Sequence, residues 1–209
     1  MSSSRALHNT PIIGIAGWKK SGKTTLTIRL VEEFTRRGLK VSTVKHAHHA
    51  FQIDDNETDS ARHRRAGARQ VAVVSNRRWA IVSELRGGPE PSFADVIGWL
   101  EPCDLIIVEG YKSAPIPKIE ARRQASLGKR ALADEDPLVL AIAADHAVDG
   151  KGLPVFSLDD VTGIADFIST AVGPLTARHS SVVPGFSLAE RVLPPIDGND
   201  PAAGGEQRG

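Results

Sequence analysis

Apolar runs alternate with amphipathic stretches along most of the chain, beginning close to its start. Residues 11–17, PIIGIAG, form an apolar run that ends in glycine, which predicts a buried strand entering a turn. Residues 23–38 change to helical spacing, with Gly38 at the position of a C-terminal cap, and residues 39–46 return to a strand pattern. A strand, a helix and a strand in so short a stretch predict a βαβ unit with parallel strands.

The same alternation continues to about residue 172. Residues 104–112, DLIIVEGYK, are the most apolar strand, and a run without polar alternation indicates burial on both faces. The pattern predicts an α/β fold with a mostly parallel central sheet. The other expected elements are a polar loop at 47–60, a short helix at 59–67 that ends at Gly67, two adjacent strands or a hairpin at 69–76 and 78–85, a helix at 91–100 with Ser92 as N-cap, strands at 116–123 and 137–145, and a strand and helix at 153–172 with a cap at Asp159 or Asp160.

The periodic pattern stops near residue 173. We therefore expect one domain at residues 1–173 and a flexible tail at residues 174–209, where proline and glycine are frequent and apolar periodicity is weak. The first 17 residues lack an apolar run long enough for a signal peptide or a membrane span, so we expect a cytoplasmic protein that does not insert into a membrane.

The composition narrows the class of protein. Lysine and arginine number 26 against 25 acidic residues, a net charge of +1, so a general affinity for nucleic acid is not expected. The single cysteine, Cys103, excludes an internal disulfide and fits a reducing cytosol. Cys103 lies beside an apolar strand without a catalytic signature, which indicates a small buried thiol.

A phosphate-binding motif lies between the first strand and the first helix. Gly17, Gly22, Lys23 and Thr24 satisfy G-x-x-x-x-G-K-[ST] in the strand–loop–helix setting that this motif requires. The glycines let backbone N–H groups converge on one point, and the helix start adds unpaired amides and the positive end of its dipole. Lys23 would bind the outer phosphates and the Thr24 hydroxyl would bind Mg²⁺. The fold expected is therefore a three-layer domain like those of P-loop NTPases.

The acid that completes such a site follows from the direction of the strands. Ligands of open α/β sheets collect at the carboxyl ends of the strands, where the phosphate motif also lies. Glu109 ends the apolar strand, whereas Asp104 begins it roughly 17 Å away at ~3.3 Å per residue. We therefore expect Glu109 to act on Mg²⁺ directly or through water, and Asp104 to lie on the far side.

Other chemistry-bearing residues fall at the same edge. Lys45 and His46 end the second strand, and the following loop carries His48, His49, Asp54 and Asp55. Without a cysteine pair or H-E-x-x-H, the histidines are expected to be exposed or to contact an anionic substrate rather than to hold structural zinc.

Two aspartates have alternative interpretations. Asp59 could place a water molecule or the metal, or could serve as N-cap of the short helix at Ser60. Asp145 ends the strand AIAAD at the ligand edge, where a carboxylate could accept the two N–H donors of guanine. The usual N-K-x-D sequence is absent, so a loop-starting aspartate is the alternative for Asp145.

These motifs together resemble one known family. The segments GWKKSGKTTL, TVKHAHH, DS…RRAGA, DLIIVEGYK, PKIEARR and LAIAAD, in this order, are similar to the molybdopterin-guanine dinucleotide biosynthesis adapter proteins, the MobB family, over roughly residues 11–172. The resemblance implies GTP and Mg²⁺ as ligands, weak GTPase activity at most, a homodimer, and a partner nucleotidyltransferase that joins GMP to molybdopterin, with molybdopterin as a further possible ligand. The residues implied in nucleotide binding are Gly17, Lys20, Ser21, Gly22, Lys23, Thr24 and Thr25, with Thr24 and Glu109 near the metal.

Two other functions use the same motif. In a small-molecule kinase, the arginines at 62–69 would form a lid over the transferred phosphate. A partition-type ATPase carries a lysine directly after the first glycine of the loop, where this chain has Trp18, and the substitution disfavours that class.

Overall fold

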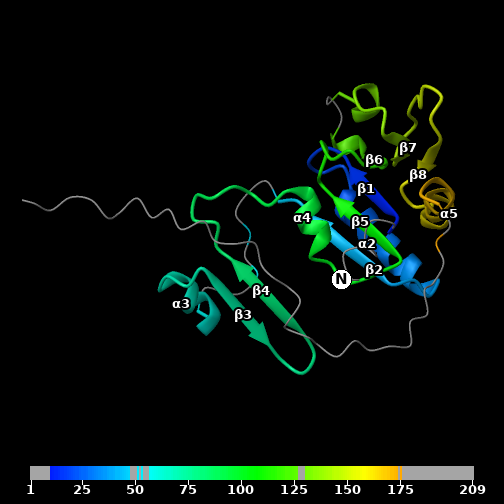
Figure 1. The fold of residues 1–209 in the computed structure, drawn as a ribbon. Coiled ribbons are helices and arrows are strands. Elements are labelled where there is room, and N and C mark those ends of the chain that lie inside the picture. Colours follow the sequence, from blue (N-terminus) through cyan, green and yellow to red (C-terminus); the bar gives the residue numbers. More distant parts are fainter. Residues whose placement is uncertain are drawn as a thin grey trace, which may run out of the picture. The chain divides into compact units, whose positions relative to one another are not determined.

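The computed structural model describes residues 10–47, 51, 53, 57–126, 130–173 and 175. Its centre is a six-stranded sheet in which every neighbouring pair of strands is parallel. The prediction of a mostly parallel sheet is confirmed, and β5 lies between the two strands of the predicted βαβ unit (Figure 1). The strand order is β2 (Val41–Lys45), β5 (Leu105–Glu109), β1 (Ile12–Ala16), β6 (Lys118–Arg122), β7 (Val139–Ala144) and β8 (Val155–Ser157).

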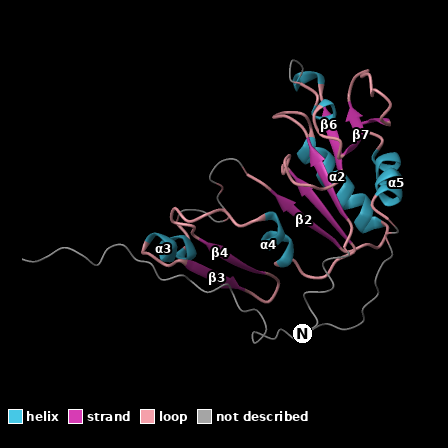
Figure 2. Cartoon of the chain, turned by 45° about the horizontal axis from the view of Figure 1, so that its top comes forward, coloured by secondary structure: helices cyan, strands magenta, loops and turns pink. Residues whose placement is uncertain are grey.

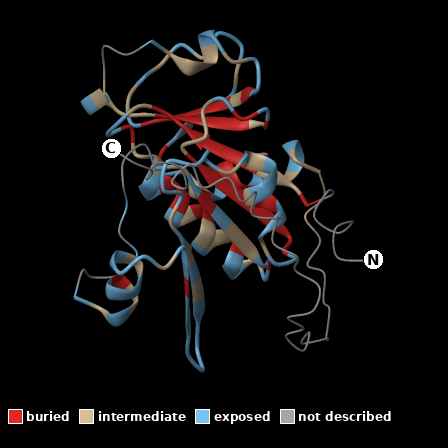
Figure 3. Ribbon diagram, turned by 60° about the vertical axis from the view of Figure 1, so that its left-hand side comes forward, coloured by how far each residue is buried: buried red, intermediate tan, exposed pale blue. Residues whose placement is uncertain are grey.

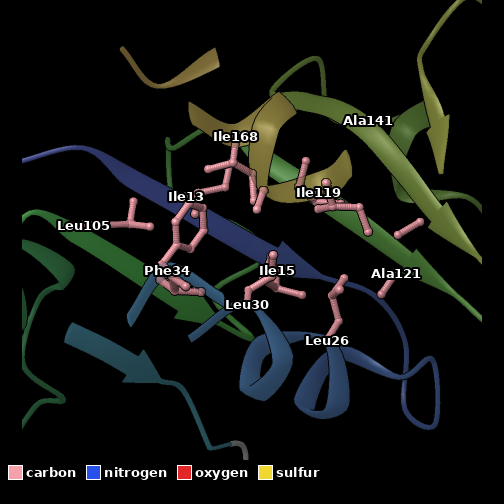
Figure 4. Close-up of a cluster of buried hydrophobic side chains, with 14 of the residues drawn as sticks. Ile13, Ile15, Leu26, Leu30, Phe34, Leu105, Ile119, Ala121, Ala141 and Ile168 are labelled. Carbon is pink, nitrogen blue, oxygen red and sulfur yellow. The ribbon is translucent and has the colours of Figure 1, made fainter. Parts of the chain in front are cut away.

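Helices cover both faces of this sheet. On one face, α2 (Lys23–Arg36) and α5 (Val161–Ala171) enclose a core in which Ile13, Leu30 and Phe34 are fully buried (Figure 4). Side chains alternate across a strand, so Ile106 and Val108 point to the other face and pack with α4 (Phe93–Gly98). Burying one such side chain contributes about 1.5–3 kcal/mol, so both faces stabilise the sheet that carries the loops.

The helix that follows β1 ends as its sequence predicts. Gly38 has φ +84°, and its N–H donates to Thr35 O at 2.9 Å, while the Leu39 N–H donates to Phe34 O at 3.1 Å. This is a Schellman motif, in which a left-handed glycine lets two N–H groups reach back to the last turn. The turn brings the chain to β2, whose carboxyl end lies at the same edge as that of β1.

A separate two-stranded antiparallel sheet consists of β3 (Gln70–Val74) and β4 (Trp79–Ser83), and α3 (Asp59–Arg65) packs against β3 (Figure 2). The hairpin interpretation is confirmed. Figure 3 shows that buried residues concentrate in the central sheet, whereas most residues of β3 are exposed.

The caps of α4 and α5 agree with the sequence more closely than the length of α4 does. Helix α4 is shorter than the predicted 91–100, but Ser92 is its N-cap and forms a capping box with Asp95. Asp160 caps α5, and two short 3-10 turns, Gln124–Ser126 and Leu132–Asp134, follow β6. The tail lies almost wholly outside the described residues, and its boundary at 173 stays a prediction. Among the helices that the structure describes, none has the length and apolar character needed to cross a membrane.

Candidate phosphate-binding site

The loop between β1 and α2 has the backbone conformation of a phosphate cradle. Gly17 and Gly22 have φ angles of +148° and +91°, and a side chain at Gly17 would overlap the Ser21 hydroxyl and the Ala121 carbonyl oxygen. Only glycine satisfies both demands, because it tolerates positive φ and lets backbones approach closely. Lys20 also has a positive φ, +69°, and is exposed, and its contact with phosphate stays a prediction.

Ser21 points into this loop. Its residue is 1% exposed, and its hydroxyl has no hydrogen-bond partner among the described residues. A buried polar atom without a partner is costly in a folded protein, typically about 1–3 kcal/mol. Phosphate oxygens are strong acceptors, so the hydroxyl suits a ligand that occupies the cradle.

Lys23 begins α2 and reaches back across the loop. Its Nζ donates to Trp18 O at 2.7 Å. Burial lowers the pKa of Lys23, the charges of Lys112 and Lys45 lower it further, and the charge of Glu109 opposes the change. Lys112 and Lys45 thus both repel the Lys23 ammonium group, and a polyanion bound beside Lys23 would offset this repulsion.

Glu109 reaches the site as predicted. The Thr24 hydroxyl donates to Glu109 Oε1 at 2.7 Å, and Lys45 Nζ lies 3.3 Å from the same oxygen. Glu109 is paired in register with Lys45 on one side and with Ile15 on the other. Asp104 lies at the opposite end of β5 and accepts the Lys40 N–H at 2.8 Å, which confirms its predicted place on the far side.

The donor set fits Mg²⁺ held together with a nucleotide. A hydroxyl and a carboxylate are hard oxygen ligands, and Mg²⁺ usually takes few protein ligands and completes its shell with phosphates and water. No group of three or more histidine, cysteine or acidic side chains suited to a metal occurs in the described part of the chain. Thr24 and Glu109 could therefore hold Mg²⁺ beside a phosphate chain.

His46 lines a pocket next to this site. Its Nε2 lies 2.9 Å from Glu90 Oε1, and its ring centre lies 4.5 Å from that of Tyr111. Burial raises the pKa of Tyr111, and the charge of Glu90 adds to the effect. The pocket has a volume of about 430 Å³, and its lining is His46, Glu90, Pro91, Gly110, Tyr111, Lys112 and Ser113. Contact of His46 with the nucleotide stays a prediction.

Asp145 follows β7 at the same edge, but its carboxylate already has partners. Its Oδ1 accepts the Gln124 N–H at 2.8 Å and lies 2.9 Å from His146 Nδ1. The His146 hydrogen bond, followed by that from Gln124, lowers the pKa of Asp145. The carboxylate thus anchors the loop after β6, and recognition of guanine by Asp145 stays a prediction.

The capping role of Asp59 is wrong by one residue. The N-cap of α3 is Thr58, whose hydroxyl accepts the Ala61 N–H at 3.3 Å, because the helix already begins at Asp59. Asp59 instead lies 3.7 Å from Arg62 on the first turn of α3, where a negative side chain interacts favourably with the positive end of the helix dipole. Its predicted role beside the nucleotide stays a prediction. His48, His49, Asp54 and Asp55 lie outside the described residues.

Two residues of the site were missed from the sequence. Trp18 joins the loop to a distant segment, since its Nε1 donates to Arg130 O at 2.7 Å and Lys112 Nζ lies 3.7 Å from the ring centre. Arg123 lies beside Gly22: a Cβ built on the glycine would be 2.7 Å from Arg123 Nε. Arg123 could have been expected at the ligand edge for the same reason as Asp145, because PKIEARR also ends a parallel strand.

The family assignment rests on more than these motifs. A family model for molybdopterin guanine dinucleotide synthesis protein B, MobB, matches residues 12–145. The chain belongs to the MobB family. The matched segment contains the phosphate cradle, Glu109 and Asp145, so it spans all the residues predicted to bind the nucleotide.

Relatives and solved structures of the MobB family match this chain over most of its length. The molybdopterin-guanine dinucleotide biosynthesis adapter protein of Haemophilus influenzae is 37% identical over 77% of this chain and 89% of its own length. That of Escherichia coli is 32% identical over 76% of this chain and 91% of its own. The crystal structure of Bacillus subtilis MobB matches with a TM-score of 0.58 and 26% identity, covering 78% of this chain and 98% of that one. The MobB homolog of Bacillus stearothermophilus gives a TM-score of 0.56, 28% identity, and coverage of 77% and 97%.

Proposed function

We propose that this MobB protein is a GTP-binding adapter in the biosynthesis of molybdopterin guanine dinucleotide. The observation that carries the nucleotide site is the Thr24–Glu109 hydrogen bond at the mouth of a glycine-built cradle. The names of its relatives support the adapter role, since proteins 37% and 32% identical are molybdopterin-guanine dinucleotide biosynthesis adapter proteins.

Each residue of the cradle has a separate task in this proposal. The backbone N–H groups at the start of α2 and the Ser21 hydroxyl bind phosphate oxygens. Lys23 moves from its contact with Trp18 O to the outer phosphates, whose negative charge offsets the burial that lowers the pKa of Lys23. Bound Mg²⁺ would neutralise charge on the phosphates, with Thr24 and Glu109 as its protein ligands.

Slow hydrolysis follows from how Glu109 is held. Its Oε1 already accepts from Thr24 and faces the Lys45 ammonium at 3.3 Å. A carboxylate oxygen that already accepts from a hydroxyl and faces an ammonium group is less available to take a proton from an attacking water molecule. We propose that the protein holds GTP for the reaction of a partner nucleotidyltransferase, acts in the cytoplasm as a homodimer, and turns GTP over slowly by itself.

The alternative of a small-molecule kinase receives less support. A kinase lid needs arginines that are free to close over a phosphate. Arg64 lies 3.3 Å from Glu84 and Arg62 lies 3.7 Å from Asp59, so two arginines of the run are paired beside their own helix and hairpin.

The deciding experiment measures GTP binding by calorimetry, and then turnover with and without the nucleotidyltransferase and molybdopterin. We expect Mg²⁺-dependent GTP binding, slow turnover alone, and more molybdopterin guanine dinucleotide when the transferase works with this protein. Rapid phosphoryl transfer to a small acceptor without the transferase would favour the kinase. Absence of nucleotide binding would refute the proposed site.

A further inference from the structure

We infer that Arg123 supplies a guanidinium group to the phosphate chain of the nucleotide, as a binding residue contributed from the strand on the other side of β1 from Glu109. This inference rests on the proposed function, because it assumes that the cradle holds a nucleotide. It adds the end of β6 to the site, since Arg123 directly follows β6 (Lys118–Arg122), whereas Glu109 ends β5.

The guanidinium lies at the entrance of α2. A Cβ built on Gly22 would be 2.7 Å from Arg123 Nε and 3.2 Å from its Cζ, so the guanidinium occupies the space that the glycine leaves open. Gly22 is the N-cap of α2, where the amide groups of the first turn have no partners within the helix. Arg123 therefore lies beside the backbone groups that would bind phosphate.

The Arg123 guanidinium adds positive charge to a helix start that is already positive. The helix N-terminus carries a partial positive charge, and Lys23 on its first turn adds a full one. The charge of Arg123 also interacts favourably with the Asp145 carboxylate. An anion between the guanidinium and the helix start would be attracted by both of them.

The guanidinium is also available for a ligand. The neighbouring Arg122 donates to Glu120 Oε2 at 2.7 Å, but the Arg123 guanidinium forms no hydrogen bond or ion pair within the described part of the chain. Five N–H donors in a planar fork match the geometry of phosphate oxygens.

The backbone around Arg123 is fixed by hydrogen bonds on both sides. Its carbonyl oxygen accepts from the Ser126 hydroxyl and the Ser126 N–H, each at 2.8 Å. The next residue, Gln124, donates its N–H to Asp145 Oδ1 at 2.8 Å. Further along, Arg130 O accepts a hydrogen bond from Trp18 of the phosphate loop. These contacts hold the backbone near Arg123 in place, and none of them involves its guanidinium group.

The test compares Arg123→Gln, Arg123→Lys and the control Arg130→Gln by calorimetry with Mg²⁺–GTP and with Mg²⁺–tripolyphosphate. Arg130 belongs to the same segment, but its guanidinium is exposed and lies 2.9 Å from Glu135. We expect Arg123→Gln to weaken both ligands roughly tenfold to a hundredfold, the magnitude of a charge-assisted hydrogen bond. Arg123→Lys should recover part of the affinity, and Arg130→Gln should match the unaltered protein. Without ligand, all should unfold at the same temperature.

The outcomes separate the two proposals. If the unaltered protein binds GTP and Arg123→Gln binds it equally well, the role of Arg123 is refuted and the proposed function stands. A loss for GTP without a loss for tripolyphosphate would place Arg123 on the base or ribose and would also refute a phosphate contact. If the unaltered protein binds neither ligand, both proposals fail.

Discussion

The hydroxyl of Thr24 donates to Glu109 Oε1 at 2.7 Å, which links the first turn of α2 to the end of β5 across 85 positions of sequence. The contact exists because β5 pairs in parallel with β1, so the end of β5 lies beside the loop that leaves β1. Two residues that could hold one metal ion are thus brought together by the strand order.

Replacing Glu109 tests this relationship. We expect Glu109→Gln to reduce the affinity for GTP at least about tenfold in the presence of Mg²⁺ and much less in EDTA, because the carboxylate acts through the metal. Calorimetry under both conditions measures the difference.

Asp104→Asn is the matched control, because Asp104 lies at the other end of the same strand, where it accepts the Lys40 N–H. It should lower the unfolding temperature and leave the affinity for GTP unchanged. Equal effects of Glu109→Gln with and without Mg²⁺ would contradict a role at the metal.

Lys23→Ala should remove nucleotide binding without unfolding the protein. Lys23 is not a packing residue: its Nζ donates to Trp18 O, and Lys45 and Lys112 repel it. Loss of the ammonium group relieves that repulsion but removes the charge that would bind the outer phosphates. Calorimetry and circular dichroism should show no detectable binding and an unchanged spectrum. A variant that unfolds would mean that the loop is mainly structural.

The fold could be predicted largely because its signals are local. Apolar periodicity located the strands, and the rule that ligands collect at the carboxyl ends of parallel strands separated Glu109 from Asp104. Both inferences need only the strand direction and the positions of residues within a strand. The hairpin of β3 and β4 followed from two β-branched runs with a short connection.

The contacts that were missed depend on residues far apart in sequence. Trp18 donates to Arg130 across 112 positions, and no local pattern encodes that pairing. Lys118 would be placed at the surface by its residue type, yet it is 1% exposed and lies 2.9 Å from Asp136. Thr58 was missed as a cap for a different reason, since helix boundaries shift easily by one residue.

Guanine selection can be tested at Asp145. If its carboxylate accepts the N–H groups of guanine, GTP should bind at least about tenfold more tightly than ATP, and Asp145→Asn should reduce this ratio strongly. Asparagine keeps an acceptor for the Gln124 N–H, so the loop should remain anchored. Asp149→Asn, in the loop after the same strand, provides the control. Equal affinities of the unaltered protein for GTP and ATP would refute the assignment.

The acid dependence of stability has an identifiable contribution from Glu33. Hydrogen bonds from Arg36 and then Arg37 lower the pKa of Glu33 from 4.5 to about 2. A folded-state pKa below the unfolded one stabilises the fold above pH 4.5, and this stabilisation is lost as the pH falls from 4.5 to about 2. We expect Glu33→Gln to have a lower urea midpoint than the unaltered protein at pH 7, with a difference that narrows below pH 4.5. A difference that stays constant between pH 7 and pH 3 would contradict this.

The ion pair between the buried Lys118 and the half-buried Asp136 gives a prediction about stability alone. Lys118 Nζ lies 2.9 Å from Asp136 and donates to Ala114 O at 2.6 Å and Ile116 O at 3.1 Å, so all three of its protons have acceptors. Asp136→Ala would leave a buried ammonium group without its counter-charge, and we expect a loss of about 3 kcal/mol in the free energy of unfolding.

Lys118→Met should lower the free energy of unfolding by a similar amount. The double variant should lower it by less than the sum of the two single losses, because the two residues interact. Urea denaturation of the four proteins measures the coupling. Additive losses would show that the pair does not stabilise the fold. Lys118 begins β6, at the end of the strand away from Arg123, so Asp136→Ala should keep its affinity for GTP.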